Sequence, residues 1–510
     1  MKINQRRAGV LLSYGYTGIN ALVGFIYVPL LIFFLGKDEY GLYQIMGSIL
    51  VYLSLFDFGL SNTVTRYYSK YLALKDEKGG ENLLAISTII YLVLTLVLIF
   101  AGTILYFFID DIYSGTLTTS ELITSQKMYI IILFNVSITI STAVFKSIIE
   151  AHEKFVFLKG LSILQTIIRP IVVLAVFSIE SSALILVIIE AFINIVAVAI
   201  KIFYTLNKLK VKIKFSFWDK PLFKEMIRFS FFVFITAIMD QLFWRSDQLI
   251  LGAVSGTSEV AIFSIASQIV SLYMALSIAM SGVFLPNVTK RVMNHASNSE
   301  LSELFIKIGR IQYLLLGAVL IGFILYGQEF ITIWVGEGFR KSYYITLIIM
   351  IPFTIDLIQN IGLTILQAKN LYSFRALVFL GMAIIKVAVS IPVANYYGGI
   401  GTAFVTGVSF LIGNGLIMNI YYNKEIGLDI YSFWKAISKL SIPLLFAYGI
   451  GKFIDLISIG TPILTLLIKL ALFIIVYIFL IFNLGMNQYE KGLIKGSIQF
   501  IIKLKKKTQF

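Results

Sequence analysis

Charged and amide side chains stand inside a stretch of this sequence that is otherwise apolar enough to cross a lipid bilayer. The stretch reads IMDQLFWRSDQLILG and covers residues 238–252. In a helix, which turns about 100° per residue, Asp240 and Asp247 lie within about 20° of each other. The side chains that follow on the same side are Gln241, Trp244, Arg245 and Gln248. A charge that faces lipid costs at least ~3 kcal/mol, so this polar face is expected to look toward protein or water.

Other ionisable side chains stand near the centres of further apolar stretches. They are Asp57, Arg169, Glu190, Asp356 and Lys386, and Gln165 precedes Arg169 by one helical turn. Two explanations are open: ion pairs that lock helices together, or a polar cavity. Because ionisable groups inside a membrane mark functional sites by default, we favour a cavity. Its cations would suit an anionic ligand.

The elements that carry these side chains are predicted to be membrane-spanning helices. The 510 residues are 58% hydrophobic and 14% charged, whereas soluble domains are about one quarter charged. The apolar blocks are roughly 20 residues long or more and do not alternate with polar residues, which indicates helices and not a barrel. Fourteen spans fit, at residues 9–36, 41–67, 82–109, 126–149, 156–179, 182–204, 226–254, 258–289, 304–327, 342–367, 373–394, 399–422, 435–454 and 462–483.

The distribution of basic residues supports this number of spans. Of the 42 lysines and arginines, 33 fall in the termini and in the loops after even-numbered spans, and five fall in the opposite loops. Such a bias places both termini in the cytoplasm. The stretch 9–36 lacks a small-residue cleavage site, so it is expected to be a retained span. Lys469, a cation within the last span, is expected to snorkel to the membrane surface.

Two pairs of similar segments indicate an internal repeat. LGKDEYGLYQIMGS (35–48) matches SGTSEVAIFSIASQ (255–268) at an offset of 220, and EAHEKFVF (150–157) matches QAKNLYSF (367–374) at an offset of 217. Six spans lie between the repeats, so the halves are parallel and related by an axis along the membrane normal. The predicted division is an N-terminal six-helix bundle (1–207), a basic cytoplasmic linker (208–225), a second six-helix bundle (226–424), two further helices (425–486) and a basic amphipathic cytoplasmic tail (487–510).

Composition and motifs argue against several classes of function. The chain has no cysteine and two histidines, which makes a disulfide impossible and a zinc site unexpected. The net charge of +15 follows membrane topology, so we expect membrane lipids and no nucleic acid as partners. No nucleophile–base motif stands in a soluble domain. We therefore expect no catalytic residues, no metal and no cofactor.

The segment from the first span into the second carries a resemblance to a known family. EYGLYQ…FDFGLSNTVTRYYSKYLA (39–73) resembles the polysaccharide-transporter family of lipid-linked oligosaccharide flippases (Wzx-like). That family shares a superfamily with the MATE exporters and the lipid II flippases. The matching residues are Glu39, Tyr40, Gly41, Tyr43, Asp57, Gly59, Leu60 and Arg66. The stretch 9–36 has none of the arginines of lipid II flippases, which favours a capsule or other surface polysaccharide.

The resemblance implies a MATE-like all-α integral membrane protein of the bacterial plasma membrane, with 14 transmembrane helices as two six-helix bundles plus two C-terminal helices. It also implies alternating access to a cavity, in which a polyprenyl-pyrophosphate-linked oligosaccharide passes from the inner to the outer leaflet. A polysaccharide polymerase and glycosyltransferases would be its protein partners.

Each of the polar side chains named above has an expected role in the site. Arg169, Arg245 and Lys386 would neutralise the pyrophosphate. The sugar would be bound by Gln165, Gln241, Trp244 and Gln248. The cavity acids, of which some would couple transport to Na+ or H+, are Asp57, Glu190, Asp240, Asp247 and Asp356.

Two alternatives stay open. A cation-coupled multidrug exporter of the MATE type would need a net acidic cavity, and five acids against three bases do not exclude it. A membrane-embedded glycan polymerase or ligase would need a large external loop. The longest such loop here, residues 110–125, is small.

Overall fold

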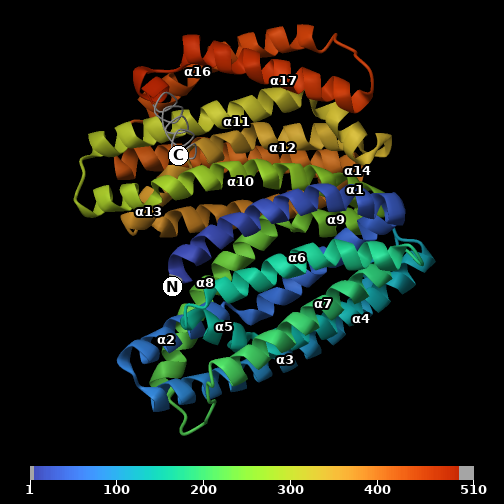
Figure 1. Ribbon diagram of the computed structural model, residues 1–510, viewed down its shortest axis with the longest axis vertical. Coiled ribbons are helices and arrows are strands. Elements are labelled where there is room, and N and C mark those ends of the chain that lie inside the picture. The colour runs from blue at the N-terminus through green and yellow to red at the C-terminus, as the bar shows by residue number, and fades with distance from the viewer. Residues whose placement is uncertain (1–4, 493–510) are drawn as a thin grey trace, which may run out of the picture. The chain divides into compact units, whose positions relative to one another are not determined.

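Helices make up all the regular structure of the described part of this chain. A computed structural model describes residues 5–492, and every regular element in that range is a helix (Figure 1). The all-α fold predicted from the sequence is thereby confirmed. Of the predicted tail, residues 487–510, the part beyond residue 492 lies outside the described residues.

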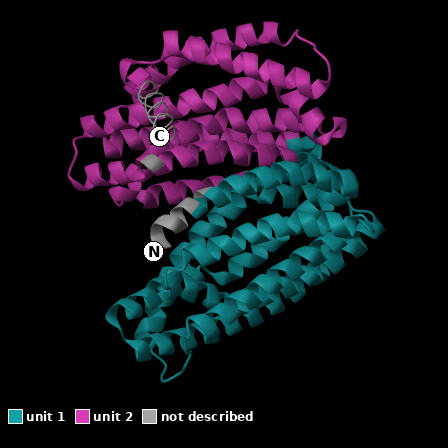
Figure 2. Cartoon of the chain, viewed as in Figure 1, with its two compact units in different colours: residues 1–264, 387–399 teal, residues 265–386, 400–510 magenta. Residues whose placement is uncertain are grey.

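The described residues form two compact units, coloured separately in Figure 2. Unit 1 comprises residues 1–264 and 387–399. Its helices are α1 (Gln5–Ser54), α2 (Leu60–Leu74), α3 (Glu77–Tyr113), α4 (Thr119–Ser141), α5 (Ala143–Ala151), α6 (Phe155–Phe177), α7 (Ala183–Phe203), α8 (Lys220–Trp244) and α9 (Ser246–Ser255). A short 3₁₀ helix (Leu55–Asp57) joins α1 to α2, and a π-helical turn (Tyr204–Lys208) follows α7.

Unit 2 comprises residues 265–386 and 400–510. Two of its helices, α10 (Thr257–Met293) and α14 (Tyr372–Phe410), also contribute residues 257–264 and 387–399 to unit 1. The others are α11 (Asn298–Val335), α12 (Lys341–Ile358), α13 (Asn360–Ala368), α15 (Asn419–Tyr421), α16 (Ile430–Ile454) and α17 (Pro462–Leu480). Short 3₁₀ and π-helical turns cover Glu337–Phe339, Leu411–Met418, Tyr422–Ile426 and Ile481–Gly485. A core of apolar side chains, among them Leu440, Leu444 and Phe473, packs α11 against α16 and α17.

Twelve helical stretches among the described residues are long and apolar enough to span a membrane. Two of them, residues 15–74 and 372–426, have 60 and 55 residues. At 1.5 Å per residue each is far longer than the ~30 Å of a hydrocarbon core. Each is interrupted by a non-helical glycine, Gly36 or Gly398, near the predicted boundary between two spans. The number of fourteen spans itself stays a prediction.

The predicted repeat has structural counterparts in the two halves of the chain. Gly36 (φ 75°, ψ −179°) and Gly256 (φ 84°, ψ 176°) interrupt the helical path in nearly the same conformation, 220 residues apart. This backbone conformation is available almost only to glycine. A second pair of interruptions, at Thr142 between α4 and α5 and at Gln359 between α12 and α13, is 217 residues apart. The sequence predicted the offsets but not these interruptions.

The bundle boundaries predicted from the repeat stay a prediction. Division by contacts places residues 226–264 in unit 1, whereas the repeat assigns residues 226–424 to the second bundle. The two divisions rest on different criteria, since one follows packing and the other follows sequence similarity.

Lys469, a cation within the last predicted span, has two acidic partners. Its ammonium lies 2.9 Å from Glu329 Oε2 and 3.1 Å from Asp455 Oδ1, and its side chain is 9% exposed. The two acids come from α11 and from the end of α16, so Lys469 links α17 to both. That this lysine snorkels to the membrane surface stays a prediction.

Candidate functional site

Arg169 and Glu190, both predicted in the site, form an ion pair within unit 1. Arg169 Nη1 on α6 lies 3.5 Å from Glu190 Oε1 on α7. The hydroxyl of Tyr43 on α1 donates to the same carboxylate oxygen at 2.8 Å. The Arg169 side chain is 46% exposed, so a second anion has access to its guanidinium. Gln165, half-buried, lies one turn before Arg169 on α6.

The polar stretch 238–252 is not one continuous helix. Helix α8 ends at Trp244, the backbone of Arg245 leaves helical geometry (φ −116°, ψ −16°), and α9 begins at Ser246. Asp240, before the interruption, is exposed, whereas Asp247, after it, is buried. The single polar face expected for an unbroken helix is therefore divided between α8 and α9.

The amide of Gln248 is engaged inside unit 1. Its Oε1 accepts a hydrogen bond from Ser48 on α1, and its Nε2 donates to Ser264 on α10 at 3.1 Å. Arg245 Nη1 also donates to Gln248 Oε1, at 3.4 Å. Because the side chain is buried and joins three helices, Gln248 orients Arg245 in this structure. Gln241 and Trp244 are half-buried on α8.

Unit 2 holds two of the predicted site residues. Asp356 on α12 lies 3.4 Å from Arg375 Nη2 on α14, and both side chains are largely buried. Lys386, further along α14, is fully buried. Arg169 and Arg245 belong to unit 1 and Lys386 to unit 2, so their joint binding of one pyrophosphate stays a prediction.

Asp57 lies at an interruption of the helical path in unit 1. Phe58 and Gly59 both have left-handed backbone conformations (φ 50° and 68°) between the 3₁₀ helix and α2. The Asp57 carboxylate accepts hydrogen bonds from the Ser61 hydroxyl at 2.9 Å and the Ser61 amide at 3.4 Å. A non-glycine residue in this conformation costs of order 1–3 kcal/mol and is found mostly at functional sites.

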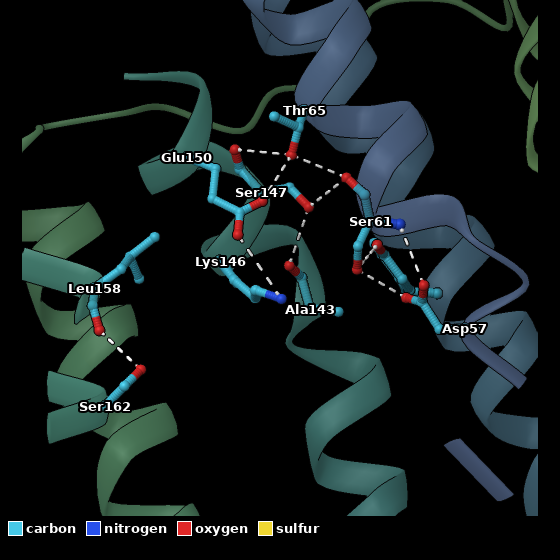
Figure 3. A network of polar contacts seen from close by, with 10 residues as sticks. Asp57, Ser61, Thr65, Ala143, Lys146, Ser147, Glu150, Leu158 and Ser162 are labelled. Atoms are coloured by element: carbon cyan, nitrogen blue, oxygen red, sulfur yellow. Dashed lines mark hydrogen bonds and ion pairs between the residues drawn. The ribbon is translucent and has the colours of Figure 1, made fainter. Parts of the chain in front are cut away.

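A polar network connects α2 to α5 beside Asp57, as Figure 3 shows. The hydroxyl of Ser147 on α5 donates to the Ser61 carbonyl at 3.0 Å. On α5, Glu150 accepts from Thr65 at 3.3 Å and pairs with Lys146 at 3.7 Å. The network fixes α5 against α2, so Lys146 and Asp57 stand on facing elements.

Lys146 and Asp57 line a cavity of about 300 Å³ within unit 1. Lys201 on α7 contributes a second ammonium. The remaining polar lining side chains are Ser54, Ser61, Asn62, Thr139 and Thr142. Asn194 on α7 donates to Thr139 at 2.8 Å and to Asn135 on α4 at 2.7 Å, which fixes α7 against α4.

Three basic residues at these sites were not identified from the sequence as site residues. Lys146, Lys201 and Arg375 stand near predicted span ends and were counted among the cytoplasmic topology charges. The structure places all three within helices, two at the cavity and one beside Asp356. The spacing of Lys146 and Glu150, four residues apart on α5, was the available signal for a helical pair.

Comparison with known proteins identifies the family. Residues 7–292, more than half of the chain, match the family described as polysaccharide biosynthesis protein. The chain belongs to this family. This polysaccharide biosynthesis protein is also 23% identical, over 392 residues, to a Shigella flexneri protein named as an O-antigen transporter. That alignment covers 76% of the present chain and 90% of the relative.

Two solved structures have a similar fold. A lipid II flippase, MurJ, superposes with a TM-score of 0.72 at 16% identity, over 92% of this polysaccharide biosynthesis protein and 98% of the other chain. A multidrug resistance MATE family transporter superposes with a TM-score of 0.64 at 13% identity, over 82% and 95% of the two chains. At these identities the likeness concerns the fold, and it confirms the predicted MATE-like architecture.

Proposed function

We propose that this protein is a flippase that moves a polyprenyl-pyrophosphate-linked oligosaccharide from the inner to the outer leaflet of the bacterial plasma membrane. The observation that carries the proposal is the family match over residues 7–292. The relationship to an O-antigen transporter and the shared fold with a lipid II flippase support the same class of substrate. The product would serve capsule or other surface polysaccharide synthesis.

The proposed mechanism is alternating access with exchange of ionic partners. The pyrophosphate of the donor lipid would displace Glu190 from Arg169, and Arg245 and Lys386 would contribute the remaining positive charge. Charged hydrogen bonds in a water-excluded site are worth more than in bulk solvent, so three cations offset the desolvation of a pyrophosphate. The polyprenol would stay in the bilayer throughout.

The sugar would be held by side chains of α8 and α6. Trp244 offers an aromatic face for stacking on a pyranose ring, and Gln241 and Gln165 offer amides for its hydroxyls. Gln248 would act by orienting Arg245, because its own amide is engaged by Ser48 and Ser264.

Coupling to Na+ or H+ would use one or more of the intramembrane acids. Asp356 and Glu190 are each paired with an arginine, so releasing either acid to a cation would leave that arginine for the substrate. The acid would exchange the arginine for a cation, and the arginine would exchange the acid for the anionic substrate. This exchange would link ion movement to glycan movement.

Transport breaks and forms no covalent bond, so we propose no catalytic residue. Lipid-linked glycan would be supplied by glycosyltransferases and consumed by a polymerase, which are the proposed protein partners. With both termini in the cytoplasm, the basic linker 208–225 would face anionic lipids of the inner leaflet.

A second candidate function, a cation-coupled multidrug exporter, rests only on the fold shared with the MATE family transporter. Complementation of a flippase-deficient bacterial strain separates the two. Restored surface polysaccharide without added drug resistance supports the flippase. Drug resistance without restored polysaccharide would replace it with the exporter.

A further inference from the structure

The cavity around Asp57, Lys146 and Lys201 has an excess of positive charge. Lys201 makes no hydrogen bond or ion pair with the side chains that the structure describes, although the Glu150 carboxylate on α5 attracts it electrostatically. The pair between Lys146 and Glu150 is 3.7 Å long and the Lys146 side chain is 53% exposed, so that pair contributes little. The oxygens of Asp57 are engaged by Ser61. Two ammonium groups thus face a cavity in which the single carboxylate already has partners.

The exposed polar lining of the cavity indicates that it opens to water and not to lipid. Asn62, Ser54 and Lys146 of the lining are all exposed. An exposed ammonium and amide facing hydrocarbon would be costly, so these side chains require an aqueous path. A polar solute can therefore reach the cavity.

The internal repeat shows that the fold does not require these charges. At offsets of 220 and 217, the counterparts of Asp57 and Lys146 in the second half are Ser277 and Leu363, and that of Lys201 is Met418. There, the Ser277 hydroxyl donates to the Leu357 carbonyl at 3.0 Å, and Ser277 is fully buried. The second half thus has no charge at any of the three positions.

The interruption beside Asp57 is also confined to the first half. The counterparts of Phe58 and Gly59 are Ile278 and Ala279, which lie inside the unbroken helix α10. Strained backbone and two lysines thus coincide at the cavity of the first half and have no counterpart in its repeat, where an acid, Asp356, stands at the position equivalent to Thr139. Such a local departure from an otherwise shared architecture points to a ligand and not to packing.

We propose that this cavity binds an acidic sugar unit of the transported glycan, a hexuronate or a sugar of the same size and charge. This deepens, and rests on, the proposed flippase function. The carboxylate would lie between Lys146 and Lys201. Ring hydroxyls would donate to Asp57 and bond with Asn62 and Thr139. A volume of about 300 Å³ suits one monosaccharide and is larger than a bare anion requires.

The test uses the full-length protein in lipid nanodiscs with three probes: D-glucuronate, D-glucose and inorganic phosphate. Apparent Kd values come from the rise of the thermal unfolding midpoint with probe concentration L, because binding to the folded state stabilises it by RT ln(1 + L/Kd). We expect glucuronate to bind about tenfold more tightly than glucose, because only glucuronate offers a carboxylate for charged hydrogen bonds with the two ammonium groups. Equal binding of glucose and glucuronate, or equally tight binding of inorganic phosphate, would overturn the proposal.

In each variant, the residue of the first half is replaced by the residue at the equivalent position of the second half, which the fold already accommodates there. Lys146→Leu with Lys201→Met should weaken glucuronate binding at least about tenfold. Asp57→Ser should weaken it while preserving the preference for glucuronate over glucose. Lys127→Gln, an exposed lysine on α4 away from the cavity, is the matched control and should leave binding unchanged. Unchanged glucuronate binding in the double variant contradicts the proposal.

Complementation separates this proposal from the function on which it rests. If the wild-type chain restores surface polysaccharide but glucuronate binding does not depend on Lys146 and Lys201, the acidic-sugar site fails and the flippase stands. If binding depends on both lysines but no polysaccharide is restored, the flippase function fails and the sugar site stands.

Discussion

Glu39 and Glu259 make the same hydrogen bond in the two halves of the chain, 220 residues apart. Glu39 Oε2 accepts from the amide of Ala183 at 2.7 Å, and Glu259 Oε2 accepts from the amide of Gly399 at 3.2 Å. Each carboxylate satisfies a backbone amide where a later helical segment begins, a position that otherwise lacks an acceptor. The repeated motif is therefore architectural, and the functional differences between the halves must lie elsewhere.

The glycine that precedes each glutamate should be required for stability. Gly36→Ala or Gly256→Ala should lower the free energy of unfolding by about 1–3 kcal/mol, because both residues occupy a conformation that is strained for alanine. Gly47→Ala is the control, since Gly47 is helical on α1 with no atom near its Cβ position. That variant should be neutral or slightly stabilising. Chemical unfolding in detergent measures all three, and an effect of Gly36→Ala no larger than that of the control would contradict the assignment.

The buried pair of Arg310 and Glu490 should stabilise unit 2. Arg310 binds both carboxylate oxygens, at 2.7 and 2.9 Å, and also donates to two backbone carbonyls. Glu490→Gln should therefore cost about 3 kcal/mol, since it leaves a buried guanidinium without its counter-ion. In the exposed pair of Arg340 and Glu337, Glu337→Gln should cost less than about 1 kcal/mol. Equal shifts of the unfolding midpoint in the two variants would show that burial does not determine how much each ion pair stabilises the protein.

Much of the fold was predictable from the sequence because long apolar blocks and the bias of basic loops each constrain it. The offset of 220 predicted that Gly36 and Gly256 would be equivalent, and both interrupt the helical path alike. The interruption at Arg245 was not predicted. A hydrophobic pattern reports which residues face lipid, but it does not report a single residue that leaves helical geometry.

The candidate site was predicted less completely. Arg169 and Glu190 were both predicted as site residues, but no sequence pattern pairs them, since they come from different helices. Lys146 and Lys201 were counted as loop charges because they stand within a few residues of predicted span ends. The positive-inside rule counts a lysine near a helix end in the same way whether its side chain faces a loop or a cavity. Only the packing of the helices shows which of the two the side chain faces.

The pair of Arg169 and Glu190 allows structure and transport to be tested separately. Arg169→Gln leaves Glu190 with Tyr43 as its hydrogen-bond donor and should lower both stability and transport. Adding Glu190→Gln removes the uncompensated charge and should restore most of the stability, while transport stays low because the substrate still lacks its cation. Thermal unfolding and complementation are measured on the same variants. Full recovery of transport in the double variant would mean that the pair is only structural.

The most direct test of the central claim is flipping by the purified full-length protein in proteoliposomes. The substrate is a fluorescent polyprenyl-pyrophosphate-linked oligosaccharide, and the signal is the fraction that a membrane-impermeant quencher can reach over time, with and without a Na+ or H+ gradient. We predict exchange between leaflets well above the rate in protein-free vesicles, and loss of that excess when Arg169 and Arg245 are both replaced by alanine. A wild-type rate equal to that of protein-free vesicles, or an unchanged rate in the double-alanine variant, would contradict the account.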